Sequence, residues 1–261
     1  MVLVLLFLFA ASIAATRWLL SRPESRMSAA QVVILAGGLG TRLRPVTAQI
    51  PKPMVPVAGI PYLEHQLRLL AEQGFRDTLL LTGYLGEQIE EYFGNGSRLR
   101  LQLRYAREPA PLGTGGALRE ARSLLADDFL LIYGDSYLPI EYSTVVDRLR
   151  GSNASGVLML YHDPSGETDV PGNVAIDERQ YVVRYDKSGA KDPELRYIEA
   201  GVLALRKSVL DLVPATGIVS LEQEVFPRLI ERGALVGLPT TQRFYDIGTP
   251  ERLRAIEALF S

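Results

Sequence analysis

The chain has 261 residues, a formal net charge of −2 and no cysteine. Its near-neutral charge balance provides no basic field for nucleic acid, and the absence of cysteine excludes disulfides and thiolate metal sites. With 47% hydrophobic residues, a chain of this length can bury the core of one α/β domain. We expect a cytoplasmic protein, because a reducing compartment suits a chain without cysteine.

The first 26 residues differ from the rest of the chain. No charge occurs from Val2 to Thr16, and Arg17, Arg22 and Arg26 then precede Met27. We favour a start codon assigned too early, with the protein beginning at Met27. A membrane anchor over residues 1–20 and a signal peptide remain the alternatives. Residues 1–26 are thus expected to be an apolar extension, and residues 27–261 a single catalytic domain.

Strands and helices alternate in the first part of this domain. Residues 32–36 form a short apolar run closed by glycines, which is typical of a buried parallel strand. A helix is expected to begin at Pro61 and to end before Gly74. The pattern continues with strand 78–82, helix 86–93, strand 101–105, helix 114–124 and strand 129–133. This alternation predicts a doubly wound, mostly parallel, Rossmann-like sheet.

The second half of the chain has a looser pattern. Strands are expected at 157–161, 174–176, 181–185 and 197–205, followed by helices at 221–232 and 250–260. We interpret this half as an insertion that builds the side of the site for a second substrate.

The first predicted strand leads into a glycine-rich loop, residues 35–45, with the sequence LAGGLGTRLRP. Glycines let backbone N–H groups approach an anion closely, so the loop is a candidate phosphate cradle. The Rossmann fingerprint fails because Leu43 stands where its third glycine belongs, and no Walker lysine occurs. Arg42 adds a forked cation suited to phosphate, and Lys52, held between two prolines, adds another.

These segments resemble the sugar-phosphate nucleotidylyltransferases. The resemblance includes LAGGLGTRLRP (35–45), PKPMVPVAGIPYLEH (51–65), PLGTGGAL (111–118), Gly134-Asp135 and FYDIGTPE (244–251). It extends from Val32 to the end of the chain. It implies an enzyme that joins a nucleoside triphosphate to a sugar 1-phosphate and releases pyrophosphate.

The resemblance and the chemistry together suggest roles for individual residues. In-line attack on the α-phosphorus requires positioning and charge neutralisation, so Arg42, Lys52 and Lys187 are the candidate catalytic residues. Asp135, which follows a buried strand, and Asp246 are the candidate ligands of Mg²⁺. Candidate nucleotide-binding residues are Leu35, Ala36, Gly37, Gly38, Gly40, Thr41, Gly113, Thr114, Gly115 and Gly116. Candidate sugar-binding residues are Gly172, Asp186, Glu199 and Gly201.

The loops at 35–45 and 111–118 look more like guanylyltransferases for mannose and manno-heptose 1-phosphates than like uridylyltransferases. GTP is therefore the favoured triphosphate. The alternative is a uridylyl- or thymidylyltransferase for glucose or amino-sugar 1-phosphates. Glu199 departs from the family, which usually has asparagine there, and an ionised carboxylate accepts hydroxyl donors but cannot donate.

Two rival functions remain open from the sequence. Glu199 would suit a regulatory relative that binds nucleotide sugars without turnover, although the cations and aspartates of a catalyst are present. A membrane-tethered assembly factor would instead use the apolar N-terminus. We expect no nucleic-acid partner, and no membrane partner unless residues 1–20 form an anchor. The sequence leaves open whether the protein forms a homo-oligomer.

Overall fold

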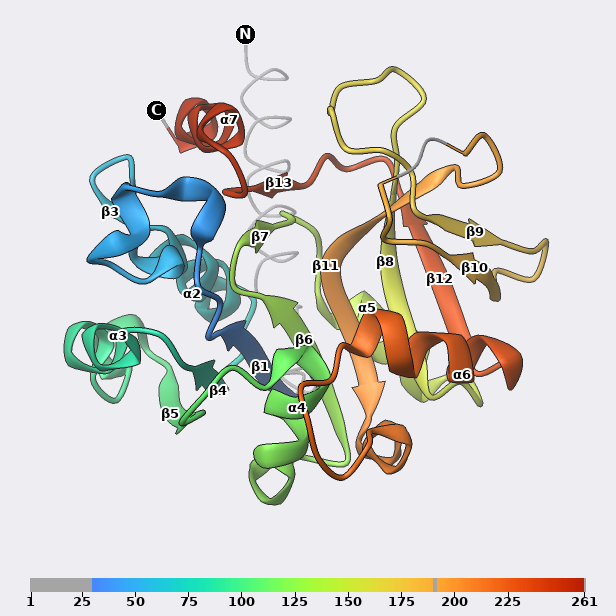
Figure 1. Ribbon diagram of the computed structural model, residues 1–261, viewed down its shortest axis with the longest axis horizontal. Helices are drawn as coiled ribbons and strands as arrows, with labels where there is room; N and C mark the ends of the chain where they lie inside the picture. Colours follow the sequence, from blue (N-terminus) through green and yellow to red (C-terminus); the bar gives the residue numbers. More distant parts are fainter. Residues whose placement is uncertain (1–29, 190–191, 261) are drawn as a thin grey trace, which may run out of the picture.

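The computed structural model describes residues 30–189 and 192–260. The apolar extension at 1–26 and the proposed start at Met27 lie outside them. A nine-stranded sheet forms the centre, with the path β10-β9-β11-β6-β1-β4-β5 and with β8 joining β11 to β12 (Figure 1). None of the helices in the described ranges is long and apolar enough to cross a membrane.

The N-terminal half supplies four adjacent parallel strands. They are β1 (Gln31–Ala36), β4 (Asp77–Thr82), β5 (Gln102–Arg107) and β6 (Asp128–Tyr133). The intervening helices are α2 (Tyr62–Glu72), α3 (Gly86–Phe93) and α4 (Gly113–Glu120). Because the four strands run in the same direction, their carboxyl ends all lie at one edge of the sheet. The predicted doubly wound α/β fold is confirmed.

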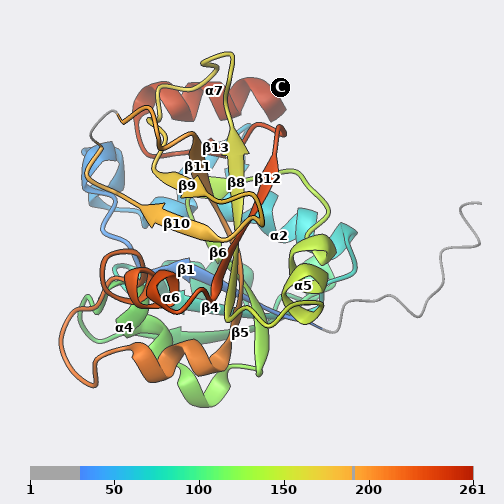
Figure 2. The same ribbon diagram turned by 90° about the vertical axis from the view of Figure 1, so that its right-hand side faces the viewer.

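The sheet is buried on both faces. Successive residues of β1 point to opposite sides, so Val32 and Ile34 join one hydrophobic core while Val33 joins another. Figure 2 shows α2 and α5 (Ser143–Arg150) on one side of the sheet, with α4 and α6 (Phe226–Glu231) on the other. A strand buried on both faces must be apolar throughout, which explains its continuous hydrophobic run.

The C-terminal half is mainly antiparallel. Its strands are β8 (Gly156–His162), β9 (Val174–Ile176), β10 (Val182–Tyr185), β11 (Tyr197–Arg206) and β12 (Leu235–Thr240). The long strand β11 pairs antiparallel with β6, β8 and β9, so it connects this half to the parallel strands. The predicted strands of the insertion are present, and β12 adds a parallel partner for β8 that the sequence did not reveal.

Several predicted boundaries change. Pro61 lies in β3 (Ile60–Pro61), paired with β2 (Pro56–Val57), so the helix begins at Tyr62. The helix predicted at 114–124 is α-helical only to Glu120 and ends in a 3₁₀ turn. Helix 221–232 begins with a π-helical turn, Leu221–Val225, before α6. The final helix, α7 (Pro250–Phe260), has the predicted bounds.

Candidate active site

Three connected cavities form a cleft at the carboxyl ends of β1 and β6. The first, of about 240 Å³, is lined by Leu35, Ala36, Gly38, Lys52, Pro53, Thr114, Tyr133, Gly134, Asp135, Lys187 and Glu222. The second continues past Gly40, Thr41 and Arg42, and the third, of about 310 Å³, reaches Asp186, Glu199 and Gly201. Asp135 lines all three cavities and therefore marks their junction.

The glycine-rich loop forms one wall of this junction. Gly40 has a φ of 61°, a left-handed conformation, and a Cβ there would lie 3.1 Å from the Cβ of Lys52. The hydroxyl of Thr47 donates to the carbonyl of Gly40 at 2.7 Å, which fixes the turn. Arg42 lines two of the cavities and has no ion-pair partner among residues 30–189 and 192–260. Its forked donors thus remain available to an anion.

Asp135 is paired with Lys52. The Lys52 ammonium donates to Asp135 Oδ2 at 2.5 Å, and Lys52 is only 9% exposed. Burial raises the pKa of Asp135, but the charges of Lys52, Arg42 and Lys187 outweigh burial and hold that pKa below its usual value. Asp135 therefore stays ionised within a ring of cations. Its other oxygen, Oδ1, has one long contact with the Ser136 hydroxyl, at 3.4 Å.

A short ladder places Asp246 beside this group. Strand β13 (Tyr245–Asp246) pairs with β7 (Ser136–Tyr137), so Asp246 lies opposite the residue that follows Asp135. The Ile247 N–H also donates to the Asp135 carbonyl at 3.1 Å. Burial and the negative charge of Asp135 raise the pKa of Asp246, despite its contact with Arg252. Two carboxylates that repel each other, beside open space, suit a divalent cation.

No described residues bring three or more histidine, cysteine, aspartate or glutamate side chains together for a metal. The candidate metal site therefore has two carboxylates, those of Asp135 and Asp246. Mg²⁺ commonly takes one or two carboxylates and completes its shell with phosphate oxygens and water. The residues present fit that donor set.

The cavity on the insertion side brings together most of the predicted sugar-binding residues. Glu199, 9% exposed, accepts from the Gly201 N–H at 2.8 Å, and its own N–H donates to Asn173 Oδ1 at 2.9 Å. Gly201 has a φ of 74°, and a Cβ there would lie 2.4 Å from Ser136 Oγ. Gly172 lies between Pro171 and Asn173, which line the cavity, and a Cβ at Gly172 would strike the Leu195 carbonyl.

Burial raises the pKa of Glu199 to about 7, with Glu222 adding to the rise and Lys187 opposing it. This carboxyl can therefore change its charge near neutral pH. The departure from the family's asparagine thus introduces a titratable group where the sugar is expected.

The loop at 111–118 is tied to a distant segment. The N–H groups of Gly115 and Gly116 donate to the Val219 carbonyl, at 2.8 and 3.3 Å. Gly113 has a φ of 75° and no room for a Cβ against the same carbonyl. Of the four predicted loop residues, Thr114 faces the first cavity. The glycines have a structural use that the sequence did not indicate.

Two functional candidates were missed from the sequence. Glu222 lines the first cavity and contacts Lys187, and Glu108 lies at the end of β5. The Oε1 atom of Glu108 is 2.8 Å from the place where a Gly37 Cβ would stand. The absence of side chains at Gly37 and Gly83 thus makes room for this carboxylate. In the sequence, both glutamates look like ordinary solvent-exposed residues. The contact between Glu108 and Gly37 is formed only by the fold, so the sequence does not reveal it.

A family model described as nucleotidyl transferase matches residues 31–260. The chain belongs to this family. The match spans both halves of the sheet and all the site residues described above. The predicted membership in the sugar-phosphate nucleotidylyltransferases is therefore confirmed, and with it the Rossmann-like fold.

Several proteins with named activities or solved structures are similar to this chain. A mannose-1-phosphate guanylyltransferase of Mycobacterium tuberculosis is 37% identical over 84% of this chain, which spans 61% of that relative's length. A D-glycero-alpha-D-manno-heptose 1-phosphate guanylyltransferase of Campylobacter jejuni is 32% identical, with 85% of this chain and 96% of the relative covered. The solved structure of HddC from Yersinia pseudotuberculosis, complexed with GMP-PN, has a TM-score of 0.75 at 28% identity, over 89% of this chain and 100% of HddC.

Proposed function

We propose that this nucleotidyl transferase moves a guanylyl group from GTP to mannose 1-phosphate or a manno-heptose 1-phosphate. The observation that carries the proposal is the convergence of Arg42, Lys52 and Lys187 on the cleft around Asp135. These cations face the space where a triphosphate and a sugar phosphate must meet. The relatives named for mannose and manno-heptose 1-phosphates support the choice of sugar.

The reaction needs no side-chain nucleophile. An oxygen of the sugar phosphate forms a bond to the α-phosphorus, and the bond from that phosphorus to the bridging oxygen breaks in line. Pyrophosphate leaves with the electron pair, so no proton transfer is required. Arg42 and Lys52 bind and orient the triphosphate, while Lys187 orients the attacking phosphate. Mg²⁺ held by Asp135 and Asp246 would supply further charge neutralisation.

Glu108 supports guanine as the base. An ionised carboxylate has two acceptor oxygens and no donor. Guanine offers two neighbouring N–H groups on its pairing edge, whereas uracil and thymine offer one N–H between two carbonyls. One Glu108 oxygen already accepts the Leu112 N–H at 3.1 Å, and the other faces the backbone of Gly37 in the glycine-rich loop. A carboxylate there would bind guanine and repel the carbonyls of uracil.

The test offers each nucleoside triphosphate with a panel of sugar 1-phosphates and measures pyrophosphate release. GTP with mannose or manno-heptose 1-phosphate should give the highest kcat/KM. Glu108→Gln supplies one acceptor and one donor, so the ratio of kcat/KM for GTP over UTP should fall by about tenfold or more. Glu178→Gln, in the exposed turn between β9 and β10, is the control. A higher kcat/KM with UTP or dTTP in the unchanged protein would overturn the choice of base.

A further inference from the structure

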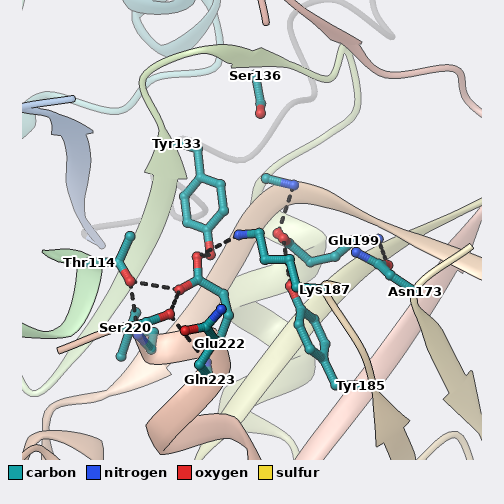
Figure 3. A network of polar contacts seen from close by, with 12 residues as sticks. Thr114, Tyr133, Ser136, Asn173, Tyr185, Lys187, Glu199, Ser220, Glu222 and Gln223 are labelled. Carbon is teal, nitrogen blue, oxygen red and sulfur yellow. Dashed lines mark hydrogen bonds and ion pairs between the residues drawn. The ribbon is translucent and has the colours of Figure 1, made fainter. Parts of the chain in front are cut away.

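Glu222 is a buried carboxylate surrounded by donors from four segments (Figure 3). Its Oε2 accepts from the hydroxyls of Ser220 and Thr114, at 2.6 and 2.7 Å. Its Oε1 accepts from the Tyr133 hydroxyl at 2.8 Å and from the Lys187 ammonium at 3.0 Å. Burial raises the pKa of Glu222, but Lys187 and the two hydroxyls outweigh burial and lower that pKa to about 2. The carboxylate is therefore ionised.

An anion at this place is unexpected. Glu222 lines the same cavity as Lys52 and Lys187, where phosphates are expected to bind. A fixed negative charge there repels a phosphate and partly neutralises the lysine that should attract one. A carboxylate that only filled space would weaken the site. Its complete set of donors indicates that it holds one of them in place.

Lys187 is the donor that most needs holding. Its side chain is 45% exposed, and its ammonium lies 5.6 Å from the centre of the Tyr133 ring. A lysine stem has several rotatable bonds, so an unheld ammonium would lose much entropy on binding phosphate. One donor directed at Glu222 fixes the nitrogen and leaves its other hydrogens for a ligand.

Thr114 links this carboxylate to the nucleotide loop. Its hydroxyl donates to Glu222 and also accepts the Leu221 N–H at 2.8 Å. Together with the contacts of Gly115 and Gly116 to Val219, this joins the start of α4 to residues 219–222. A nucleotide that orders the loop would thereby order Glu222 and the lysine it holds.

We propose that Glu222 is a positioning residue that aims Lys187 at the sugar phosphate and, through Thr114, makes the binding of the two substrates cooperative. The proposal rests on the proposed function, because it takes a nucleotide and a sugar phosphate as the ligands. Coupling of this kind is reciprocal, so each substrate should tighten the other by the same factor.

The direction in which KM for the sugar 1-phosphate changes distinguishes a positioning residue from a bystander. In Glu222→Gln, the amide carries no charge and has only one acceptor oxygen, so it cannot accept from Lys187 and from all three hydroxyls as the carboxylate does. We expect KM for the sugar 1-phosphate to rise about 10- to 100-fold, the range for losing a hydrogen bond to a charged group. At saturating sugar 1-phosphate, KM for GTP should rise only by the lost coupling factor, about 5-fold. Glu224→Gln, whose side chain accepts from the Ser220 N–H, is the matched control. If Glu222 were a bystander, removal of its charge would leave KM for the sugar 1-phosphate unchanged or lower it.

A pH profile gives a readout that a structural role would not change. Burial lowers the pKa of Lys187, and the charge of Glu222 reverses that effect. Removing the charge should lower that pKa, so the alkaline fall in kcat/KM for the sugar 1-phosphate should move to lower pH. The charged or titratable groups facing Lys187 in this space are Arg42, Lys52, Tyr133, Asp135, Tyr185, Asp186, Glu199, Glu222, Asp246 and Arg252. An alkaline limb shared by the variant and the Glu224→Gln control would contradict the positioning role.

The cooperative part is tested by equilibrium binding. Mannose 1-phosphate is titrated with and without the α,β-methylene analogue of GTP. We expect the analogue to tighten mannose 1-phosphate about 5-fold or more. Thr114→Val should abolish this factor and Thr114→Ser should restore it. Equal factors in the unchanged protein and in Thr114→Val would overturn the coupling. Failure of the unchanged protein to turn over any substrate pair would instead overturn the proposed function.

Discussion

Glu64 and Glu222 are buried to nearly the same degree, 1% and 4% exposed, and both have a pKa of about 2. Their surroundings differ. Glu64, on α2, is held by Arg68, Arg98 and Tyr92, and none of these partners lines the cleft. Burial raises the pKa of Glu64, and its arginine and tyrosine hydrogen bonds outweigh burial.

The comparison shows that a displaced pKa alone does not identify a functional group. Structural ion pairs shift pKa values as strongly as catalytic ones. The difference lies in the cation, because neither arginine at Glu64 lines the cleft, whereas Lys187 also faces the substrate space. Glu64 is therefore expected to contribute to stability and the cleft carboxylates to activity.

The largest expected effect belongs to the aspartates of the cleft. Asp135→Asn or Asp246→Asn should lower kcat at least about a hundredfold, the scale of one lost electrostatic contact in the transition state. The double variant should lose little more than either single variant, because each removes the same proposed Mg²⁺. Steady-state kinetics with an unfolding curve checks both the effect and the fold. Full activity after chelator treatment, or a kcat within a few-fold of the parent protein, would contradict the shared metal site.

Glu64→Gln should give the opposite pattern. Two half-exposed arginines lose a buried partner, so we expect a loss of about 2 kcal/mol in the free energy of unfolding with kcat unchanged. Urea unfolding measures the loss, and Glu91→Gln on the exposed side of α3 is the control. A large fall in kcat without a loss of stability would contradict the assignment of Glu64 to stability alone.

The same carboxylate should influence acid stability. Its pKa is lowered from the reference value of 4.5 to about 2 on folding. Its stabilisation is therefore complete above the unfolded pKa and is lost as the pH falls through the folded value. The difference in unfolding free energy between the parent protein and Glu64→Gln should shrink as the pH falls from 5 toward 2. A constant difference over that range would mean that the ion pairs do not produce it.

A smaller effect is expected at Glu199, the third buried glutamate with a displaced pKa. Because that pKa is about 7, the carboxyl gains its negative charge as the pH rises through neutrality. The ratio of KM for the sugar 1-phosphate between the parent protein and Glu199→Gln should change with a midpoint near pH 7. Taking the ratio cancels ionisation of the sugar phosphate itself. A flat ratio from pH 6 to 8 would show that Glu199 keeps one charge state in the working enzyme.

The smallest effect is expected from removing residues 1–26. The buried core of the described chain begins at Ala30 and β1 begins at Gln31, so a chain starting at Met27 should keep its kcat and solubility. Expression and assay of the shortened chain test this. A loss of activity would show that the extension takes part in the function.

The parallel half of the fold was predictable because its signals are local. The apolar runs at β1 and β6 and the spacing of Leu63, Leu67 and Leu70 in α2 directly indicate buried strands and an amphipathic helix. Helix α5 was overlooked although Val145, Val146 and Leu149 form a buried face. Strand β12 contains Gly237 and Pro239, which disfavour strands, and its pairing with β8 overrides them.

The site was less predictable because it depends on distant contacts. Arg42, Lys52 and Asp135 occur in recognisable motifs, and the structure places all three at one junction. The two-residue ladder of β7 and β13, which brings Asp246 to Asp135, is too short to produce a periodic pattern. Glu222 occurs in the sequence SLEQEV, where a glutamate on a helical turn suggests solvent. Its contacts with Lys187, Tyr133 and Thr114 are 35, 89 and 108 residues away in sequence.

The left-handed Gly201 has a practical meaning for enzyme engineering. Libraries intended to broaden the range of accepted sugars usually randomise every residue that lines the pocket. At position 201, any side chain would be strained by the backbone and would collide with Ser136. That collision would displace the residue next to Asp135, so such variants would lose catalysis together with selectivity. A productive library would hold Gly201 constant and vary Asp186, whose half-buried side chain lines the same cavity.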